Sequence, residues 1–121
     1  MEKEKNTRDA ALALGMLLKS HKAEDVVILD LTGSSPWTDY FVIATVTSSA
    51  HSAGLRKHVQ EALPSLSLEI RRTSHKIPDG DDWALIDLGD VVIHLMTTKA
   101  RKFYDLEKLW FDAPNIFPAK E

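Results

Sequence analysis

The hydrophobic and polar positions of the chain follow two periods, one typical of helices and the other of strands. Across residues 10–18 the apolar residues recur every three or four positions, which predicts an amphipathic helix with one buried stripe. Asn6, followed by Asp9 three residues later, is the predicted N-cap of this helix. The apolar runs at 26–31 and 40–46 are short, so they predict two buried strands.

The middle of the chain predicts a loop, a second helix and a third strand. Segment 32–38 contains Gly, Ser and Pro, a composition typical of loops. Ser48 or Ser49 is the predicted cap of a helix that ends at Pro64. The apolar face of this helix carries Leu55, Val59, Ala62 and Leu63. Residues 66–71 alternate between apolar and polar, which predicts a strand with one face in water.

A β-hairpin is the most informative prediction. After a polar segment at 75–82, which predicts a loop, residues 83–96 form two strand-like runs joined by a tight turn at Gly89-Asp90. Side chains alternate along a strand, so one face of the hairpin is wholly apolar and should be core. That face carries Ala84, Ile86, Leu88, Val91, Ile93 and Leu95, with Leu88 opposite Val91 and Ile86 opposite Ile93.

The other face of the hairpin is mixed in character. It carries Trp83, Leu85, Asp87, Val92, His94 and Met96. Large amphipathic side chains on one patch favour a recognition site. The alternative is that a helix covers this face and that His94 is a hydrogen-bonded core histidine. The hairpin pattern alone leaves both open.

The chain ends in one more helix and a tail. Thr97 or Thr98 is the predicted cap of a helix whose apolar residues are Phe103, Leu106, Leu109 and Trp110, and we expect Phe103 and Leu106 to lie in the core with Trp110. The tail, residues 112–121, contains two prolines and is predicted to be irregular. The element order αββαβββα predicts an α/β fold: a single domain over residues 1–121 with a mixed sheet of about five strands.

Composition and charge exclude several classes of protein and kinds of site. The chain has 121 residues, 44% hydrophobic and 27% charged, as expected for one globular domain. Its net charge of −3 argues against a dedicated DNA or RNA binder. The absence of cysteine excludes disulfides and thiolate metal sites. The N-terminus has no apolar segment of a secretory signal, and the apolar runs are too short to cross a membrane, so we expect a cytoplasmic location.

Three motifs, in this order, resemble those of the ribosome silencing factor (Iojap) family. They are D-Y-F at 39–41, W-x-x-x-D-x-G-D-x-x-x-H at 83–94 and R-x-x-Y-x-L-E-x-L-W at 101–110. The resemblance runs from about residue 9 to residue 110, which is nearly the whole chain. It implies a nucleotidyltransferase-like fold and a non-enzymatic protein that binds ribosomal protein fourteen of the large ribosomal subunit. Bound there, such a protein blocks joining of the small subunit when nutrients are scarce, and it is often a homodimer when free.

The resemblance and the mixed hairpin face together indicate a partner-binding set. Its members are Trp83, Asp87, His94, Met96, Arg101 and Tyr104. We expect Trp83 to be the buried anchor, Met96 an adaptable apolar contact, and Asp87 the partner of a basic group. Arg101 reaches either the partner or Asp105 in its own helix. Asp39, Tyr40 and Asp90 are expected to support the adjoining loop and turn.

The main alternative is a nucleotidyltransferase-related nucleotide-binding protein or enzyme, which the implied nucleotidyltransferase-like fold suggests together with Gly33-Ser34 followed by Asp39. Such enzymes hold two metal ions with clustered carboxylates, but the apolar Phe41 stands where the second carboxylate would be expected. We therefore expect no catalysis, no cofactor and no bound metal. A purely structural dimerisation module also remains possible from the pattern.

Histidines and lysines offer two weaker site hypotheses. His51 and His58 lack the further ligands that a metal site needs. Lys99, Arg101 and Lys102 form a small basic cluster that either makes a limited contact with ribosomal RNA or is simply a solvated helix face.

Overall fold

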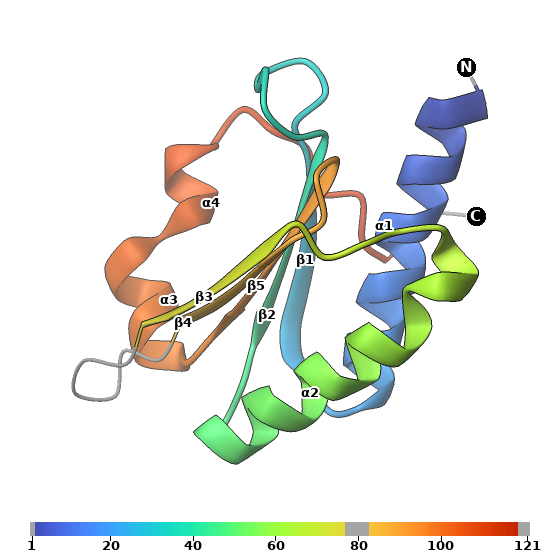
Figure 1. The fold of residues 1–121 in the computed structure, drawn as a ribbon. Coiled ribbons are helices and arrows are strands. Elements are labelled where there is room, and N and C mark those ends of the chain that lie inside the picture. Colours follow the sequence, from blue (N-terminus) through green and yellow to red (C-terminus); the bar gives the residue numbers. More distant parts are fainter. Residues whose placement is uncertain (1, 77–82, 119–121) are drawn as a thin grey trace.

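The computed structural model describes residues 2–76 and 83–118 and contains one five-stranded sheet between two layers of helices (Figure 1). The elements are α1 (Glu2–Ser20), β1 (Glu24–Asp30), β2 (Tyr40–Thr45), α2 (Ser49–Ala62), a short 3-10 helix (Pro64–Leu66), β3 (Arg72–Lys76), β4 (Trp83–Asp87), β5 (Val91–Met96), α3 (Thr98–Tyr104) and α4 (Leu106–Leu109). The strand order is β1-β2-β5-β4-β3. Among the strands that the structure describes, β2 and β5 pair in parallel and the other neighbours pair antiparallel, so the sheet is mixed, as predicted.

Each face of the sheet has its own helices. Helices α1 and α2 cover what we call the first face, and α3 and α4 lie over the second face (Figure 1). The first face holds the main core, in which α1 contributes Leu14 and Leu18 and α2 contributes Leu55 and Val59. The core on the second face is smaller and centres on Leu29, Leu31, Ile43, Met96 and Ala100.

The hairpin matches its prediction. Ile86 lies opposite Ile93, and the Leu88 N–H donates to the Val91 carbonyl at 2.9 Å. The six side chains predicted to be core all lie on the first face and are at most 3% exposed. Gly89 has a φ of +93° in the connecting turn, a conformation that strongly favours glycine. Local patterning was therefore sufficient to predict this element and its register.

The predicted start of the first helix is wrong. Helix α1 begins at Glu2, so Asn6 lies inside the helix instead of capping it. The physical reason is in the sequence of the first turn, Glu-Lys-Glu-Lys, whose residues have high helix propensity. The N-terminal sequence therefore extends the helix beyond the apolar stripe from which its start was predicted.

The strand predicted at 66–71 is also wrong. Leu66 ends the short 3-10 helix and residues 67–71 are irregular. Strand β3 begins at Arg72 and reaches Lys76, inside the segment predicted as a loop. The rest of that predicted loop, 77–82, lies outside the described residues. Ser67 adopts a left-handed φ of 56°, which interrupts any extended strand, although the alternating apolar side chains still pack against the main core.

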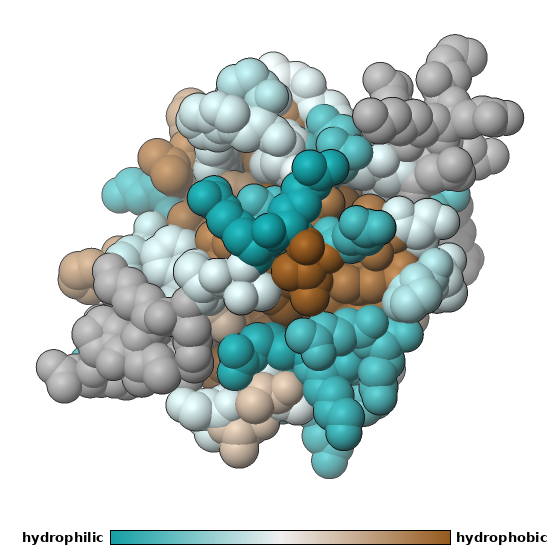
Figure 2. All heavy atoms as spheres, in the orientation of Figure 1, coloured by the Kyte–Doolittle hydropathy of each residue, from teal (hydrophilic) through white to brown (hydrophobic). Residues whose placement is uncertain are grey.

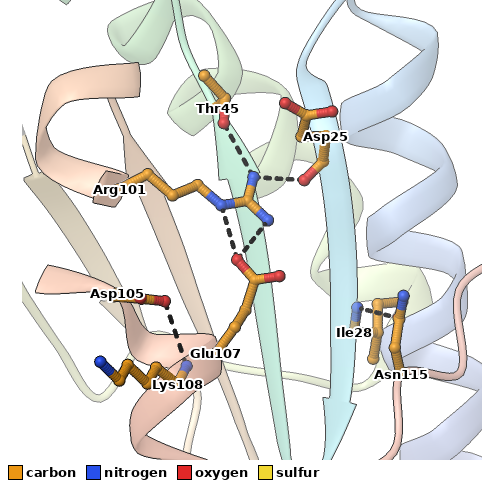
Figure 3. A network of polar contacts seen from close by, with 8 residues as sticks. All are labelled: Asp25, Ile28, Thr45, Arg101, Asp105, Glu107, Lys108 and Asn115. Atoms are coloured by element: carbon orange, nitrogen blue, oxygen red, sulfur yellow. Dashed lines mark hydrogen bonds and ion pairs between the residues drawn. The ribbon is translucent and has the colours of Figure 1, made fainter. Parts of the chain in front are cut away.

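The tail runs along the outer edge of β1. The Pro114 carbonyl accepts from the Asp30 N–H at 2.9 Å, and the Ile116 N–H donates to the Ile28 carbonyl at 2.8 Å. Asn115 adds a side-chain contact, since its Oδ1 accepts from the Ile28 N–H at 3.0 Å (Figure 3). Phe117 inserts into the main core and is 7% exposed. The tail thus satisfies backbone groups that an open strand edge would leave unpaired.

Candidate functional site

Three of the predicted partner-binding residues meet on the second face, where β4 and β5 approach α3. The indole N–H of Trp83 donates to Nδ1 of His94, with the two nitrogens 3.1 Å apart. On its other side the Trp83 ring packs against Tyr104, with the ring centroids 4.5 Å apart. Trp83 is half-buried, so it remains accessible while its position is held by two neighbours.

His94 and Met96 lie inside the domain. His94 is 3% exposed and Met96 is 0% exposed, because α3 packs over this end of β5 through Ala100 and Tyr104. Burial lowers the pKa of His94 to about 4, since the charged imidazolium is poorly solvated there. Direct contact with a partner, which we expected of both side chains, therefore does not fit the structure. The helix-covered alternative describes them correctly.

Asp87 has its partners within the chain. One carboxylate oxygen lies 3.3 Å from Nε of Arg72 on the neighbouring strand, and the other accepts from the Gly89 N–H at 2.8 Å. The carboxylate thus closes the hairpin turn and ties β4 to β3. The basic group that we expected a partner to supply is already supplied by Arg72.

Arg101 lies at the centre of a polar network that joins α3, α4, β1 and β2 (Figure 3). Its guanidinium donates to Oγ1 of Thr45 at 2.8 Å and to the carbonyl of Asp25, and Nη2 lies 3.1 Å from a carboxylate oxygen of Glu107. Its side chain is only 12% exposed. The prediction that Arg101 pairs with Asp105 or reaches a partner is corrected: the ion pair is with Glu107.

The reason for this correction is a break in the last helix. Asp105 adopts a left-handed φ of 41° and ends α3, and its carboxylate then caps α4 by accepting from the Lys108 N–H at 3.2 Å. An N-capping Asp followed by helix-forming residues is a sequence signal that would have predicted the break. The single predicted helix is therefore two short ones.

The break also exposes apolar side chains that the single-helix prediction assigned to one buried stripe. Phe103 is 73% exposed and Leu109 is 69% exposed, whereas Leu106 and Trp110 pack against the smaller core. Figure 2 shows apolar side chains at the surface on the side of α3 and α4. The expectation that Phe103 belongs to the core is therefore wrong.

These exposed side chains line one open groove. The groove, of about 600 Å³, is lined by Lys102, Phe103, Tyr104, Asp105, Lys108, Leu109 and Phe111. We call it the α3–α4 groove. Phe111, at its rim, is 84% exposed. Tyr104 joins the groove to Trp83, so the two form one continuous surface with apolar side chains and two lysines.

Asp39, Tyr40 and Asp90 meet at the other end of the hairpin from Trp83. The Asp90 carbonyl accepts from the N–H groups of Asp39 and Tyr40, at 2.9 and 3.1 Å. This contact holds the loop after β1 against the β4–β5 turn. Tyr40 is 4% exposed, and burial, together with the nearby Asp30 carboxylate, raises the pKa of its phenol. The Tyr40 side chain is therefore part of the main core.

The histidines considered as metal ligands, His51 and His58, instead link α2 to the turn after α1 and to the segment before α2. Nδ1 of His51 accepts from the Thr47 N–H at 3.1 Å, and Nε2 lies 3.1 Å from the His21 carbonyl oxygen. The His58 ring stacks on the ring of His21 with 3.7 Å between centroids. Within residues 2–76 and 83–118, no group of three or more histidines and carboxylates is arranged to hold a metal ion. In the same residues, every helix is too short or too polar to span a membrane.

Comparison with known proteins agrees with the motifs. A family model described as "Ribosomal silencing factor during starvation" matches residues 4–121. The chain is 36% identical over 104 residues to Ribosomal silencing factor RsfS of Treponema pallidum, covering 85% of this chain and 91% of that protein. It is 34% identical over 102 residues to the Mus musculus protein Mitochondrial assembly of ribosomal large subunit protein 1, covering 78% of this chain and 42% of that one.

A solved structure gives the same result for the fold. The crystal structure of a protein from Chromobacterium violaceum superposes with a TM-score of 0.72 at 27% identity, covering 88% of this chain and 85% of the other. The family match spans nearly the entire chain, including all three motifs. The chain therefore belongs to the ribosomal silencing factor family.

Proposed function

We propose that this protein binds the large ribosomal subunit and, by occupying the face that the small subunit would contact, prevents the two subunits from joining. Family membership is the observation that carries the proposal. The name of the mouse relative, which refers to assembly of the ribosomal large subunit, supports that subunit as the partner. Within it we propose ribosomal protein fourteen as the docking point, as the motif resemblance implies. Its place of action is then the cytoplasm.

The proposed contact surface is Trp83 with Tyr104 and the adjoining α3–α4 groove. Contiguous exposed apolar side chains on a monomer are typical of interaction sites. Phe103, Leu109 and Phe111 supply such side chains in one groove, and Trp83 is a half-buried aromatic residue of the kind that often dominates binding energy. Lys102 and Lys108, on the groove, are placed to meet nearby acidic groups or ribosomal RNA phosphates.

The proposed mechanism is steric and needs no chemical step. A domain docked at the subunit interface excludes the other subunit by its volume alone. What the protein must supply is a surface whose shape is already formed before binding, because ordering it on binding would cost affinity. The Arg101 network supports this requirement, since it ties α3 and α4 to the sheet through Thr45, Asp25 and Glu107. We therefore propose a binding protein and not an enzyme.

The same surface offers a reason for self-association of free copies. A groove that exposes Phe103 and Phe111 in the unbound protein is one that a second copy could cover. We propose that a homodimer, where it forms, competes with the ribosome for this groove.

The test is co-sedimentation of the purified protein with isolated large and small subunits on sucrose gradients. We expect the wild type to travel with the large subunit alone and Trp83→Ala, still folded by circular dichroism, to remain at the top. Trp37→Ala is the matched control. Trp37 is 80% exposed and lies in the loop between β1 and β2. This loop contacts the β4–β5 turn, which is at the other end of the hairpin from Trp83. Wild type that binds neither subunit would overturn the function, and equal loss in both variants would overturn the site.

A further inference from the structure

His94 is an imidazole buried among aromatic rings. Its ring lies 4.5 Å from that of Phe41, nearly edge to face, and 5.8 Å from that of Trp83. Its cross-strand neighbours are the apolar Ile43 and Leu85. Such surroundings would suit a hydrocarbon side chain at least as well as a polar one, so the presence of histidine calls for a physical reason.

The hydrogen-bond arrangement makes histidine a costly choice for packing alone. Nδ1 accepts from the Trp83 N–H, so the proton of the neutral imidazole must sit on Nε2. Nε2 is fully buried and has no hydrogen-bond partner among the described residues. A buried donor left without an acceptor lowers stability. Among the described residues, the single hydrogen bond that the His94 side chain makes, and that a hydrocarbon could not make, is therefore the one with Trp83.

We propose that His94 is a positioning residue that fixes the indole of Trp83 for binding and leaves it an apolar contact surface. This rests on the proposed function, in which Trp83 is the anchor. The acceptor at Nδ1 holds one side of the indole and the Tyr104 ring packs on the other, 4.5 Å away. A half-buried tryptophan held in this way loses little conformational freedom when a partner docks.

The hydrogen bond also determines what chemistry Trp83 offers. The indole N–H is the only polar group of that side chain, and it is satisfied inside the domain by His94. The part of the ring that remains accessible is therefore hydrocarbon. The partner surface against Trp83 is accordingly apolar and does not need a hydrogen-bond acceptor.

Two substitutions of similar size separate positioning from packing. His94→Asn keeps an acceptor, because the Asn side-chain oxygen can lie close to the position of Nδ1. The Leu side chain of His94→Leu has nearly the same shape as that of Asn but has no acceptor. The first measurement is hydrogen exchange of the Trp83 indole N–H by NMR in the free protein, with the Trp37 and Trp110 indoles as internal references. We expect exchange in the Leu variant to be about tenfold faster than in the wild type and the Asn variant.

The second measurement is affinity for isolated large subunits. We expect the Asn variant to stay within about threefold of the wild type and the Leu variant to bind about tenfold more weakly. On a Trp83→Phe background, which keeps a ring but removes the N–H, the change to Leu should have little further effect, because His94 acts through Trp83. If the Leu variant does not fold, His94→Val takes its place, because it is smaller and also lacks an acceptor for the Trp83 indole N–H.

The outcomes separate this proposal from the proposed function. Equal indole exchange in the Asn and Leu variants would overturn the positioning role whatever the ribosome result. Faster exchange in the Leu variant with unchanged affinity would show that the fixed indole does not serve binding and would also overturn it. If the wild type binds no subunit, the proposed function fails, and the exchange result still reports whether His94 holds Trp83.

Discussion

The two faces of the sheet are built from the same strands but differ in how completely they are covered. On β4 the side chains alternate between buried and half-buried along the whole strand. The buried ones lie on the first face under α1 and α2, which are 19 and 14 residues long. Within residues 2–76 and 83–118, the helices on the second face are α3 and α4, of 7 and 4 residues, and they leave part of it open.

Because of this difference, we assign stability mainly to the first face and partner binding to the second. The first face carries the larger apolar core, and burial of apolar surface is the main source of folding free energy. The second face combines a small core, the Arg101 network and the exposed α3–α4 groove. We infer that substitutions on the first face act on stability, whereas accessible residues on the second face can be changed with a specific effect on binding.

The largest expected effect is on the first face. Ile93→Ala removes a fully buried side chain, and we expect the free energy of unfolding to fall by about 4 kcal/mol because of lost burial and a residual cavity. Urea denaturation measures it. Val92→Ala, at the preceding position of β5 and only half-buried on the second face, is the matched control and should cost about 1 kcal/mol. Equal losses would contradict the distinction between the faces.

A pH effect should come from His94. Its folded-state pKa of about 4 lies below the ordinary value of 6.5, so the unfolded chain takes up a proton at a higher pH than the folded protein does. Stability should therefore decrease as the pH falls from 6.5 to 4, by about 3 kcal/mol from this group. Comparing the pH dependence of urea unfolding in wild type and His94→Asn isolates the contribution. A dependence of the same size in both proteins would contradict it.

The Arg101 network should matter less than the main core. Arg101→Met removes charge-assisted hydrogen bonds to Thr45, Glu107 and the Asp25 carbonyl, and we expect a loss of about 2 kcal/mol in thermal or urea unfolding. Lys102→Met, at the next and exposed position, should change stability by less than about 0.5 kcal/mol. A similar small value for Arg101→Met would mean that α3 and α4 are held by their apolar contacts alone.

The smallest effect on stability is expected in the groove. Phe111→Ser changes a side chain that is 84% exposed, so unfolding should shift by less than about 0.5 kcal/mol. Binding to the large subunit should nevertheless weaken about tenfold if the groove is part of the contact surface. The measurement is co-sedimentation at several protein concentrations, beside a size-exclusion profile of the free protein. Unchanged binding would restrict the contact surface to Trp83 and its immediate neighbours.

Much of the first face could be predicted from sequence. The apolar periods around Leu14 and Leu55, the alternation along β4 and β5, and the Gly89 turn all depend on residues close together in the chain. Local patterns of this kind encode which side of an element faces the core, so they also predicted the pairing of Ile86 with Ile93. The motifs at 39–41, 83–94 and 101–110 likewise sufficed to predict the family.

The arrangement of side chains on the second face could not be predicted from sequence, because it depends on contacts between residues that are distant in the chain. The mixed pattern at Trp83, His94 and Met96 fits a covered face as well as an open one, and only the docking of α3 shows that His94 and Met96 are inside. The pairing of Arg101 with Glu107 depends on the break at Asp105, and the position of β3 depends on its pairing with β4. Sequence thus predicted the fold class and the family and indicated Trp83 as a candidate contact residue, since these predictions rest on local periodicity and motif. Tertiary structure decided which polar groups are satisfied internally and which apolar groups stay exposed, because burial of a side chain depends on what packs against it from elsewhere in the chain.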